Sequence, residues 1–272
     1  MVRTVYRSET VPVSRLTNST ETVRDCTVSL LRGGSGPPLL FLHGAGGGGI
    51  ELPFMTRLAE RYDLIAPEHP GFGGSDEPDW FDNIHDVAYF YLDFLDHLDL
   101  TGVHLAGMSL GGWIAMEVAV RSTARLASLT LVCPAGVHVP GLATGDPFAW
   151  SPEETFRQGF HDRAFAEAAI ARLPEAVEAD DIWLKNRSSF ARLAWEPRLH
   201  DPHLPKWLHR IDVPTHIVWG AHDNILSADH AEAIAGMIPG AGVTVVPEAG
   251  HFLHIEKADA LVAAIAAHAQ GE

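Results

Sequence analysis

The sequence predicts an α/β protein with a mainly parallel sheet, and two observations support this. Short runs of aliphatic and β-branched residues recur, each followed by a turn and then by a helical pattern, which is the sequence sign of β-α-β units. The clearest runs, at residues 39–42, 64–66 and 103–106, all stop at candidate functional loops. Open parallel sheets bind their ligands beside the carboxyl ends of their strands, so the fold class also predicts where a site lies.

The helices and the remaining strands follow from the spacing of apolar residues. Between the second and third runs, apolar residues recur at helical spacing and predict a helix with one buried face: Ile84, Val87, Ala88, Tyr91, Leu92, Leu95 and Leu98. Residues 110–120 are almost continuously apolar apart from Glu117 and predict a buried helix. Residues 126–132, 215–219 and 243–246 indicate further strands, and residues 255–268 a closing helix.

The pattern changes between residues 137 and 210. Strand-like runs disappear there, while large aromatic residues stand among helix formers and prolines: Trp150, Phe156, Phe160, Phe165, Trp183, Phe190, Trp195 and Trp207. Because β-α alternation resumes at residue 215, we expect residues 137–210 to form an inserted helical lid, with residues 1–136 and 211–272 as the core. The alternative is a set of ordinary helices that cover the sheet.

Composition narrows the class of protein. The 272 residues are enough for one domain that carries an insertion. Acidic residues outnumber Lys and Arg by 35 to 19, and the negative field repels phosphate backbones and anionic lipids, so we expect neither nucleic acid nor a membrane as a partner. The polar N-terminal residues predict a cytoplasmic protein. Cys26 and Cys133 lie in strand-like apolar surroundings, which predicts buried free thiols.

A candidate nucleophile stands where the third strand meets the buried helix. The segment Gly107-Met108-Ser109-Leu110-Gly111 has the pattern G-x-S-x-G, in which small flanking residues permit a sharp, strained turn that projects the serine hydroxyl above the sheet. The pentapeptide alone is a weak signal, and the strand before it and the helix after it strengthen it. The alternative is that Ser109 only caps the helix.

A serine hydroxyl needs a base to take its proton and a carboxylate to orient that base. Asp223 follows the strand at 215–219, and His251 follows the strand at 243–246, so both lie in loops at strand ends, as Ser109 does. The chain order Ser, Asp, His fits a serine in this kind of turn. His251 is preferred to His254, because His254 falls in the first turn of the closing helix. Asp223 also has a plain interpretation as a turn residue.

Acyl transfer also needs hydrogen-bond donors for the oxyanion that forms at the attacked carbonyl. The backbone N–H of Leu110, next after the nucleophile, is expected to be one donor. The second is expected from the glycine-rich loop at residues 43–49, where glycines let backbone N–H groups approach a ligand closely. Ala45 and Gly46 are the candidates for this donor.

The same loop supports a rival function. Gly44, Gly46 and Gly49 match G-x-G-x-x-G after a strand, and Glu68 falls where a ribose-binding acid is expected, as in an NAD-dependent oxidoreductase. Against this, His43 before the glycines has no role in phosphate binding, and a dinucleotide site leaves the serine, aspartate and histidine unexplained. A metal site is not expected either, since the closely spaced histidines are interleaved with prolines and lack a defined ligand set: His200, His203 and His209.

Together these motifs resemble the successive signatures of the α/β-hydrolase superfamily. They cover the chain except the lid: His43-Gly44, Pro70-Gly71-Phe72-Gly73-Gly74-Ser75, Gly107-Met108-Ser109-Leu110-Gly111-Gly112, Gly220-Ala221-His222-Asp223 and Gly250-His251. The resemblance implies an eight-stranded α/β-hydrolase sheet with helices on both faces, a helical cap after the sixth strand, and a hydrolase without a cofactor. The chain also resembles the branch with esterases and meta-cleavage-product carbon–carbon hydrolases. A serine nucleophile disfavours haloalkane dehalogenases and epoxide hydrolases, whose alkyl-enzyme ester requires a carboxylate.

Within that superfamily we expect a serine hydrolase of carboxylic esters with a hydrophobic acyl or alcohol group, because the aromatic lid predicts an apolar pocket. Carbon–carbon hydrolases typically carry a tryptophan after the catalytic histidine, where this chain has Phe252, and an arginine in the cap. That activity, a haloperoxidase-like or perhydrolase activity and a non-catalytic ligand receptor stay open. The expected partner is a small-molecule substrate, and a homodimer is left open. The candidate substrate-binding residues are His43, Met108, Trp113, Arg192 and Phe252.

Overall fold

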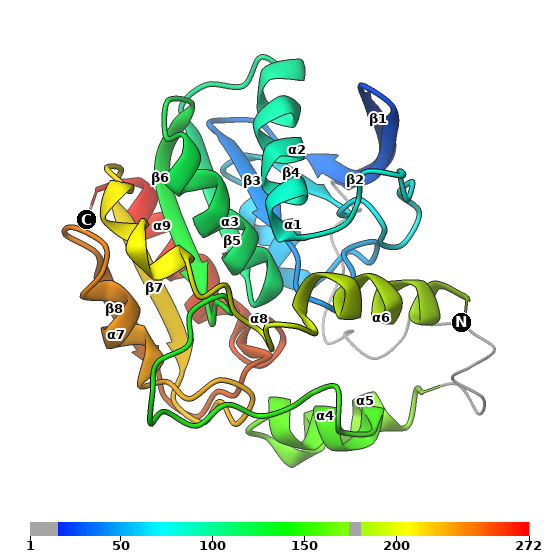
Figure 1. Cartoon of the computed structure of the whole chain (residues 1–272), viewed down its shortest axis with the longest axis vertical. Coiled ribbons are helices and arrows are strands. Elements are labelled where there is room, and N and C mark those ends of the chain that lie inside the picture. The colour runs from blue at the N-terminus through cyan, green and yellow to red at the C-terminus, as the bar shows by residue number, and fades with distance from the viewer. Residues whose placement is uncertain (1–15, 174–180, 272) are drawn as a thin grey trace.

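The computed structural model describes residues 16–173 and 181–271, whose strands form one eight-stranded sheet (Figure 1). In chain order the strands are β1 (Leu16–Val23), β2 (Cys26–Gly33), β3 (Pro38–Leu42), β4 (Asp63–Pro67), β5 (Val103–Met108), β6 (Leu126–Val132), β7 (Thr215–Gly220) and β8 (Gly242–Val246). In space the order is β1-β2-β4-β3-β5-β6-β7-β8. The β1–β2 and β2–β4 pairs are antiparallel and the other pairs are parallel. The predicted mainly parallel, eight-stranded sheet is confirmed.

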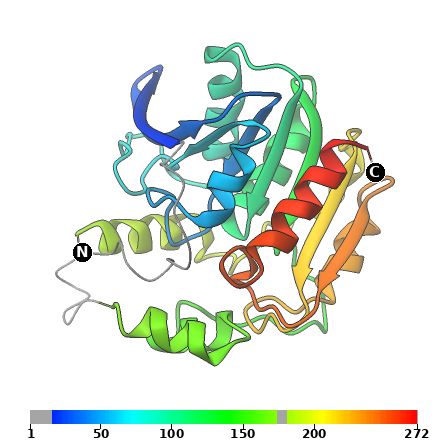
Figure 2. The same cartoon turned by 180° about the vertical axis from the view of Figure 1, so that it is seen from behind.

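Helices cover both faces of this sheet. α2 (Ile84–His97) and α3 (Leu110–Arg121) lie on the face seen in Figure 1, and α1 (Pro53–Leu58) and α9 (Ala258–Ala269) lie on the face seen in Figure 2. α7 (His230–Ala235) packs beside β7 and β8. The one closing helix expected at residues 255–268 is divided into α8 (Leu253–Glu256) and α9, because Lys257 between them leaves the helical conformation with ψ 47°.

The segment between β6 and β7 carries the helices that the sequence placed in a lid. These are α4 (Pro152–Gly159), α5 (Arg163–Ile170) and α6 (Asp181–Ala194), followed by the short 3-10 helices η2 (Leu204–Lys206) and η3 (Leu208–Arg210). α4 and α5 begin at capping residues, since the side chains of Ser151 and Asp162 accept hydrogen bonds from Glu154 N and Ala164 N. In Figures 1 and 2, α4, α5 and α6 lie together at one end of the molecule, below the sheet.

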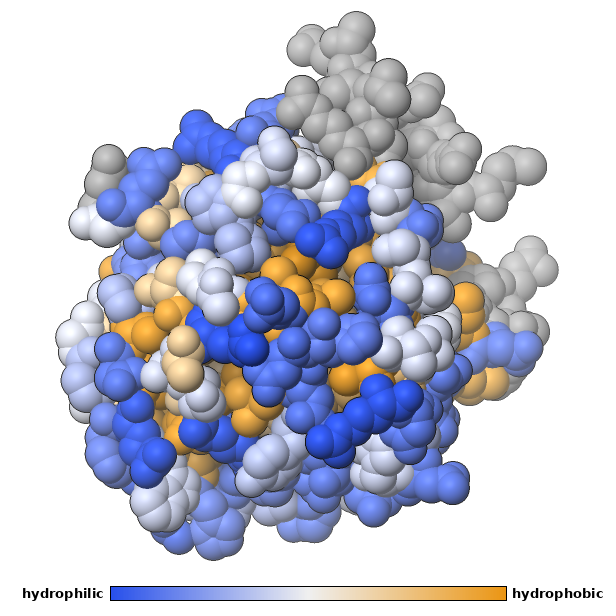
Figure 3. Space-filling view, turned by 90° about the horizontal axis from the view of Figure 1, so that it is seen from above, coloured by the Kyte–Doolittle hydropathy of each residue, from blue (hydrophilic) through white to orange (hydrophobic). Residues whose placement is uncertain are grey.

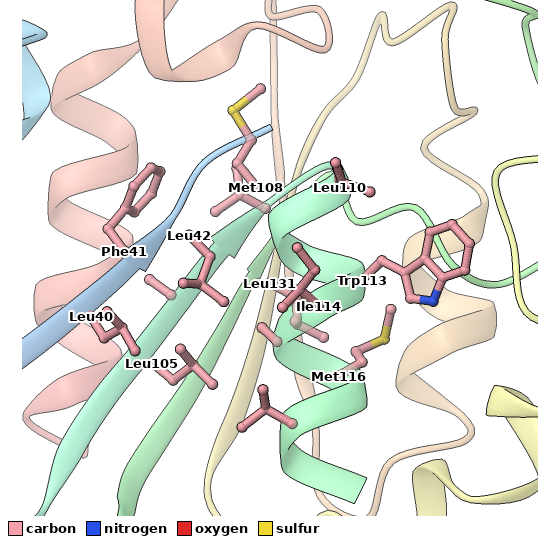
Figure 4. Packing of buried hydrophobic residues seen from close by; sticks show 14 of the residues in the cluster. Leu40, Phe41, Leu42, Leu105, Met108, Leu110, Trp113, Ile114, Met116 and Leu131 are labelled. Atoms are coloured by element: carbon pink, nitrogen blue, oxygen red, sulfur yellow. The ribbon is translucent and has the colours of Figure 1, made fainter. Parts of the chain in front are cut away.

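A large part of the core lies where α3 packs on the central strands (Figure 4). Every residue from Leu110 to Val120 is buried, and side chains of β3, β5 and β6 such as Leu42, Leu105 and Leu131 fill the space against the helix. Cys26 and Cys133 are buried free thiols, as predicted. In the view of Figure 3, hydrophilic residues cover much of the surface, with apolar residues between them. No helix in the described ranges combines the length and the apolar character needed to cross a membrane.

Candidate active site

Ser109 occupies a strained turn between β5 and α3. Its φ of 53° and ψ of −114° lie outside the regions that residues with a side chain ordinarily adopt. The backbone is held there by three hydrogen bonds: Ser109 N donates to Val132 O at 2.9 Å, and Ser109 O accepts from Trp113 N at 3.1 Å and Ala135 N at 3.0 Å. Ser109 is half-buried while its neighbours on both sides are buried, so the turn is fixed and the serine alone reaches the surface.

Two glycines allow this turn to form. A Cβ atom at Gly107 would lie 2.2 Å from Gly111 O, and one at Gly111 would lie 2.1 Å from Leu42 O. Both obstacles are backbone atoms of packed elements, which cannot swing aside as a flexible side chain does. The ends of β3 and β5 and the first turn of α3 therefore meet only because neither glycine has a side chain.

The capping alternative for Ser109 does not fit the structure. Ser109 stands at the N-cap position of α3, yet its side chain makes no capping hydrogen bond. A serine that served as a helix cap would accept a hydrogen bond from the second or third N–H of the helix. The helix therefore leaves the Ser109 hydroxyl free for another role.

Asp223 and His251 are brought together at the ends of β7 and β8. His251 Nδ1 lies 2.7 Å from Asp223 Oδ2, and the two side chains are 4% and 0% exposed. The carboxylate is held from the other side as well: Oδ1 accepts the N–H groups of Ile225 and Leu226 at 2.8 Å, and Trp219 Nε1 donates to Oδ2 at 3.1 Å. Because Nδ1 donates to Asp223, Nε2 is the nitrogen of His251 that is left to act as a base.

The second candidate histidine has a different environment. His254 stacks edge-on against Phe54 and Phe252, and its Nδ1 is buried without a hydrogen-bond partner among the described residues. Burial, reinforced by repulsion from His251, lowers the pKa of His254 to about 3. The partner of Asp223 is therefore His251, as the position in the turn had suggested.

The glycine-rich loop passes directly beside the serine. β3 and β5 pair so that Leu42 lies opposite Gly107, and a Cβ atom at Gly44 would lie 3.4 Å from the Cβ of Ser109. Within residues 16–173 and 181–271, the N–H groups of Ala45, Gly46 and Leu110 donate to no protein acceptor. These are the three N–H groups that the sequence marked as oxyanion donors.

A chain of neutral histidines, which sequence reasoning missed, holds this loop. His43 Nε2 accepts the N–H of His69 at 3.0 Å, so Nδ1 carries the proton and donates to Gly44 O at 2.6 Å. His69 Nε2 donates in turn to His43 O at 2.9 Å, and His69 Nδ1 accepts from the Tyr91 hydroxyl at 2.6 Å. Burial lowers the pKa of His43 to about 4 and that of His69 well below its usual value, so both rings are neutral at pH 7.

The five candidate substrate-binding residues differ in their burial and in their contacts. His43 is 4% exposed and uses both ring nitrogens inside the protein. Trp113 is 2% exposed, donates from Nε1 to Glu117 Oε1 at 3.2 Å, and lies across α3 from Leu42 in Figure 4. These two side chains are therefore structural, and the prediction that they contact the substrate is not supported by their contacts.

The other three candidates are Met108, Arg192 and Phe252. Met108 is buried at the end of β5. Arg192 donates to Phe81 O at 2.9 Å and pairs with Glu77 at 2.7 Å, so its guanidinium holds α6 on the loop that precedes α2. Phe252 is half-buried, and its ring lies 5.7 Å from that of His251 and 4.8 Å from that of Phe160. Phe252 is the candidate whose contacts join the histidine loop, residues 247–252, to the aromatic side chains of the predicted lid.

Glu256 is a further residue at the site that the sequence did not reveal. Its Oε2 accepts the N–H of Gly250, directly before His251, at 2.7 Å, and its Oε1 accepts the N–H of Asp162 at 2.7 Å. One carboxylate thus joins the histidine loop to the start of α5. No local sequence pattern marks this bond, because Asp162 and Glu256 are far apart in the chain.

Two groups of described residues have the donor atoms and the spacing of a metal site. Cys133, Asp223 and His251 form one, and His85, Glu117 and Asp201 form the other, with donor atoms within 4.8 Å of one another in each. In the first group the imidazole and the carboxylate are already hydrogen-bonded. In the second, Arg121 donates to Glu117 Oε2 at 2.5 Å and supplies a positive charge. Neither group contains the three histidines at 200, 203 and 209.

Comparison with known proteins places this geometry in context. The model of a family described as "Alpha/beta hydrolase family" matches residues 39–264. The dihydrolipoyllysine-residue acetyltransferase component of the acetoin cleaving system of Pseudomonas putida is 31% identical over 241 residues, which is 84% of this chain and 62% of that protein. The corresponding protein of Cupriavidus necator is 29% identical, and the match covers 88% of this chain and 65% of that protein. The chain therefore spans less than two thirds of the length of these two relatives.

Lipases and solved hydrolase structures are also similar. Lipase 1 of Psychrobacter immobilis is 27% identical over 237 residues, which is 83% of this chain and 74% of that protein. The crystal structure of a membrane phospholipase A superposes with a TM-score of 0.78 at 25% identity, covering 95% of this chain and 87% of that one. A meta-cleavage product hydrolase superposes with a TM-score of 0.78 at 20% identity, covering 93% and 98% of the two chains, a likeness of fold alone.

Proposed function

Because the chain belongs to the alpha/beta hydrolase family, we propose that it is a serine hydrolase that cleaves carboxylic esters through an acyl-enzyme on Ser109. One observation carries the proposal. A buried, hydrogen-bonded Asp223–His251 pair lies at the same edge of the sheet as a serine in a strained turn whose side chain the helix does not use. This is the arrangement that a nucleophile, a base and an orienting acid require.

The proposed reaction has two steps. His251 Nε2 takes the Ser109 hydroxyl proton as the oxygen attacks the ester carbonyl carbon, and then gives that proton to the departing alkoxide so that the alcohol leaves. In the second step His251 takes a proton from water, the hydroxide attacks the acyl-enzyme, and Ser109 leaves with the proton returned by His251. Asp223 fixes the ring with its Nδ1 proton inward throughout and stabilises the imidazolium that forms in each step.

The oxyanion of each tetrahedral intermediate is assigned to two backbone N–H groups. Leu110 N–H lies at the first turn of α3, where unpaired N–H groups and the helix dipole favour negative charge. Between Ala45 and Gly46, Ala45 is the better second donor. The N–H of Ala45 shares its peptide unit with Gly44 C=O, which accepts from His43 Nδ1 at 2.6 Å and Gly47 N at 3.2 Å, and hydrogen bonds at one end of a peptide polarise the other.

Residues 137–210 are proposed to act as a lid over this site, with residues 1–136 and 211–272 as the core. The support comes from contacts on the histidine side: Phe252 N donates to Gly159 O at 3.1 Å, and the ring of Phe252 packs against Phe156 and Phe160 of the α4 region. Such aromatic walls favour a hydrophobic acyl or alcohol group. A cytoplasmic location and a homodimer stay predictions from the sequence.

A fluorophosphonate probe tests the nucleophile. The wild-type chain should be labelled, Ser109→Ala should not be labelled, and Ser122→Ala, at the other end of α3, should be labelled like the wild type. Asp223→Asn should slow labelling by about 10³-fold or more, because the ring loses its orienting acceptor. An unlabelled wild type would refute the hydrolase proposal and leave a ligand receptor as the better interpretation. Equal labelling of Ser109→Ala would refute the proposal that Ser109 is the nucleophile.

The bond that is cleaved needs a separate experiment. We would compare kcat/KM for p-nitrophenyl esters of rising chain length with that for a vinylogous diketone acid, the substrate type of carbon–carbon hydrolases. The ester proposal expects the esters to be preferred, because Phe252 replaces the tryptophan of those enzymes and the Arg192 guanidinium is bound to Glu77. A clear preference for the diketone acid would overturn it.

A further inference from the structure

α6 is fastened to the loop at residues 71–75 by polar side chains on one of its faces. Lys185 Nζ donates to Gly73 O at 3.0 Å and also to Ser75 O, and Ser189 Oγ donates to Gly71 O at 2.5 Å. Both side chains bind backbone carbonyls of residues 71–75. Helical spacing of three to four residues puts these side chains on one side of α6, which is the side that meets the core.

Asn186, on the same face, reaches a second loop as well. Its Nδ2 donates to Gly46 O at 3.1 Å and its Oδ1 accepts the N–H of Gly73 at 2.8 Å. The side chain is buried, with the residue 7% exposed. The two partners also fix how the amide is turned, since the opposite orientation would set oxygen against oxygen and N–H against N–H.

The hydrogen bond from Asn186 to Gly46 O anchors a loop that has few other hydrogen bonds among the described residues. Four consecutive glycines, residues 46–49, make the loop costly to order. In the described part of the chain, Asn186 is the group that bonds to a carbonyl of residues 45–49. A Cβ atom at Gly47, whose φ is 95°, would lie 2.6 Å from Asn186 Nδ2, so the loop also depends on a glycine to receive this side chain.

The hydrogen bonds form one continuous path from α6 to the oxyanion donor. Asn186 Nδ2 donates to Gly46 C=O, whose peptide unit contains the N–H of Gly47. That N–H donates to Gly44 C=O at 3.2 Å, whose peptide unit contains the N–H of Ala45. Each bond both orients the next peptide plane and polarises it in the same direction.

We propose that Asn186 is a positioning residue for the oxyanion donor Ala45, so that the bond from α6 to Gly46 O determines how well the site stabilises the transition state. The proposal rests on the function proposed above. Asn186 does not touch the reacting atoms. With α6 in place the path from Asn186 to Ala45 is complete, and with α6 displaced the bond to Gly46 O is lost while the bonds from His43 and Gly47 to Gly44 O and those between His43 and His69 remain.

Asn186→Asp separates the two bonds of this side chain. An aspartate keeps an acceptor for the Gly73 N–H but turns a second acceptor toward Gly46 O, so the bond to the glycine-rich loop is replaced by repulsion between two oxygens. Ser189→Ala is the matched control, because it removes a bond between α6 and Gly71 and leaves Asn186 intact. For p-nitrophenyl ester hydrolysis we expect Asn186→Asp to lower kcat roughly tenfold with KM within twofold of the wild type. Ser189→Ala should keep both constants within twofold.

A second measurement does not need activity. Hydrogen–deuterium exchange of a peptide covering residues 43–52 should be faster in Asn186→Asp than in both the wild type and Ser189→Ala. A kcat of Asn186→Asp within twofold of the wild type, an equal loss in Ser189→Ala, or exchange unchanged by Asn186→Asp would each overturn the proposal. Failure of the wild type to react with the fluorophosphonate would refute the hydrolase function instead, and the exchange result would still test whether Asn186 anchors the loop.

Discussion

Gly107→Ala should destabilise the protein strongly, although it adds a single methyl group to a buried site. The new Cβ atom would lie 2.2 Å from Gly111 O, 2.6 Å from Gly111 C and 2.9 Å from Gly112 N. Non-bonded carbon atoms prefer roughly 3.5 Å or more, so β5 and α3 would have to separate by about 1 Å. That shift would open the packing of α3 against the central strands. Overpacking of this kind costs about 1–3 kcal/mol, and we expect about 3 kcal/mol because every obstacle is backbone.

Urea unfolding, followed by tryptophan fluorescence, measures this cost. Gly46→Ala is the matched control, because a Cβ atom there would meet nothing within 4 Å, and it should change the free energy of unfolding by about 0.5 kcal/mol or less. Gly107→Ala should also slow fluorophosphonate labelling, since any retreat of α3 moves Ser109. A Gly107→Ala variant as stable as Gly46→Ala would refute the tight turn between β5 and α3.

Acid should lower the free energy of unfolding, because burial lowers the pKa of His43 to about 4 and that of His254 to about 3. Their contribution to stability is complete above the unfolded-state pKa of about 6.5 and is lost as the pH falls from there toward 4 and 3. His85, whose pKa is raised by Glu117, has the opposite effect on the free energy of unfolding. A profile of urea midpoints that stays flat with pH would contradict the prediction. Tyr91→Phe leaves the buried Nδ1 of His69 without its hydrogen-bond donor, and should lower the free energy of unfolding by about 1–3 kcal/mol in the same assay. A decrease below about 0.5 kcal/mol would show that this hydrogen bond does not stabilise the fold. Arg192→Gln removes a partly exposed ion pair with Glu77 and should cost about 1 kcal/mol or less with KM for esters and for the diketone acid unchanged; a higher KM for the diketone acid alone would assign Arg192 to carboxylate binding.

The central strands could be predicted because they are buried on both faces. β3 to β7 include the runs at residues 39–42, 64–66, 103–106, 126–132 and 215–219, and a strand of a parallel sheet covered by helices is a continuous apolar run. β8 (Gly242–Val246) lies at the edge of the sheet and is partly exposed, and its run at residues 243–246 was recognised by its β-branched residues. β1 (Leu16–Val23) was not predicted. Its sequence LTNSTETV is polar and its residues alternate poorly in burial. Among the described strands it pairs with β2 alone, so it lacks the pattern by which a strand is recognised.

Some residues of the candidate site could be located from the sequence and others could not. Asp223 and His251 could be located, since each follows a strand and parallel strands bring their carboxyl ends to one edge. His69, Tyr91 and Glu256 could not. Their contacts join residues 26, 22 and 94 positions apart in the chain, and such pairs have no spacing to search for. His43 was predicted from the sequence as a substrate contact, and only the fold shows that both of its ring nitrogens are hydrogen-bonded inside the protein.

The segment between β6 and β7 is bonded to the site on two sides, and the two contacts belong to different parts of the core. α6 reaches the glycine-rich loop at residues 43–49 through Asn186 and Gly46, while Asp162 N–H, at the start of α5, reaches the loop that holds Gly250 and His251 through Glu256. Oxyanion stabilisation requires donors that are fixed before charge develops, and a base must keep its distance to the nucleophile. Because α5 and α6 hold different loops, we expect movement of α6 alone to weaken the proposed oxyanion donors and to leave the Asp223–His251 pair intact.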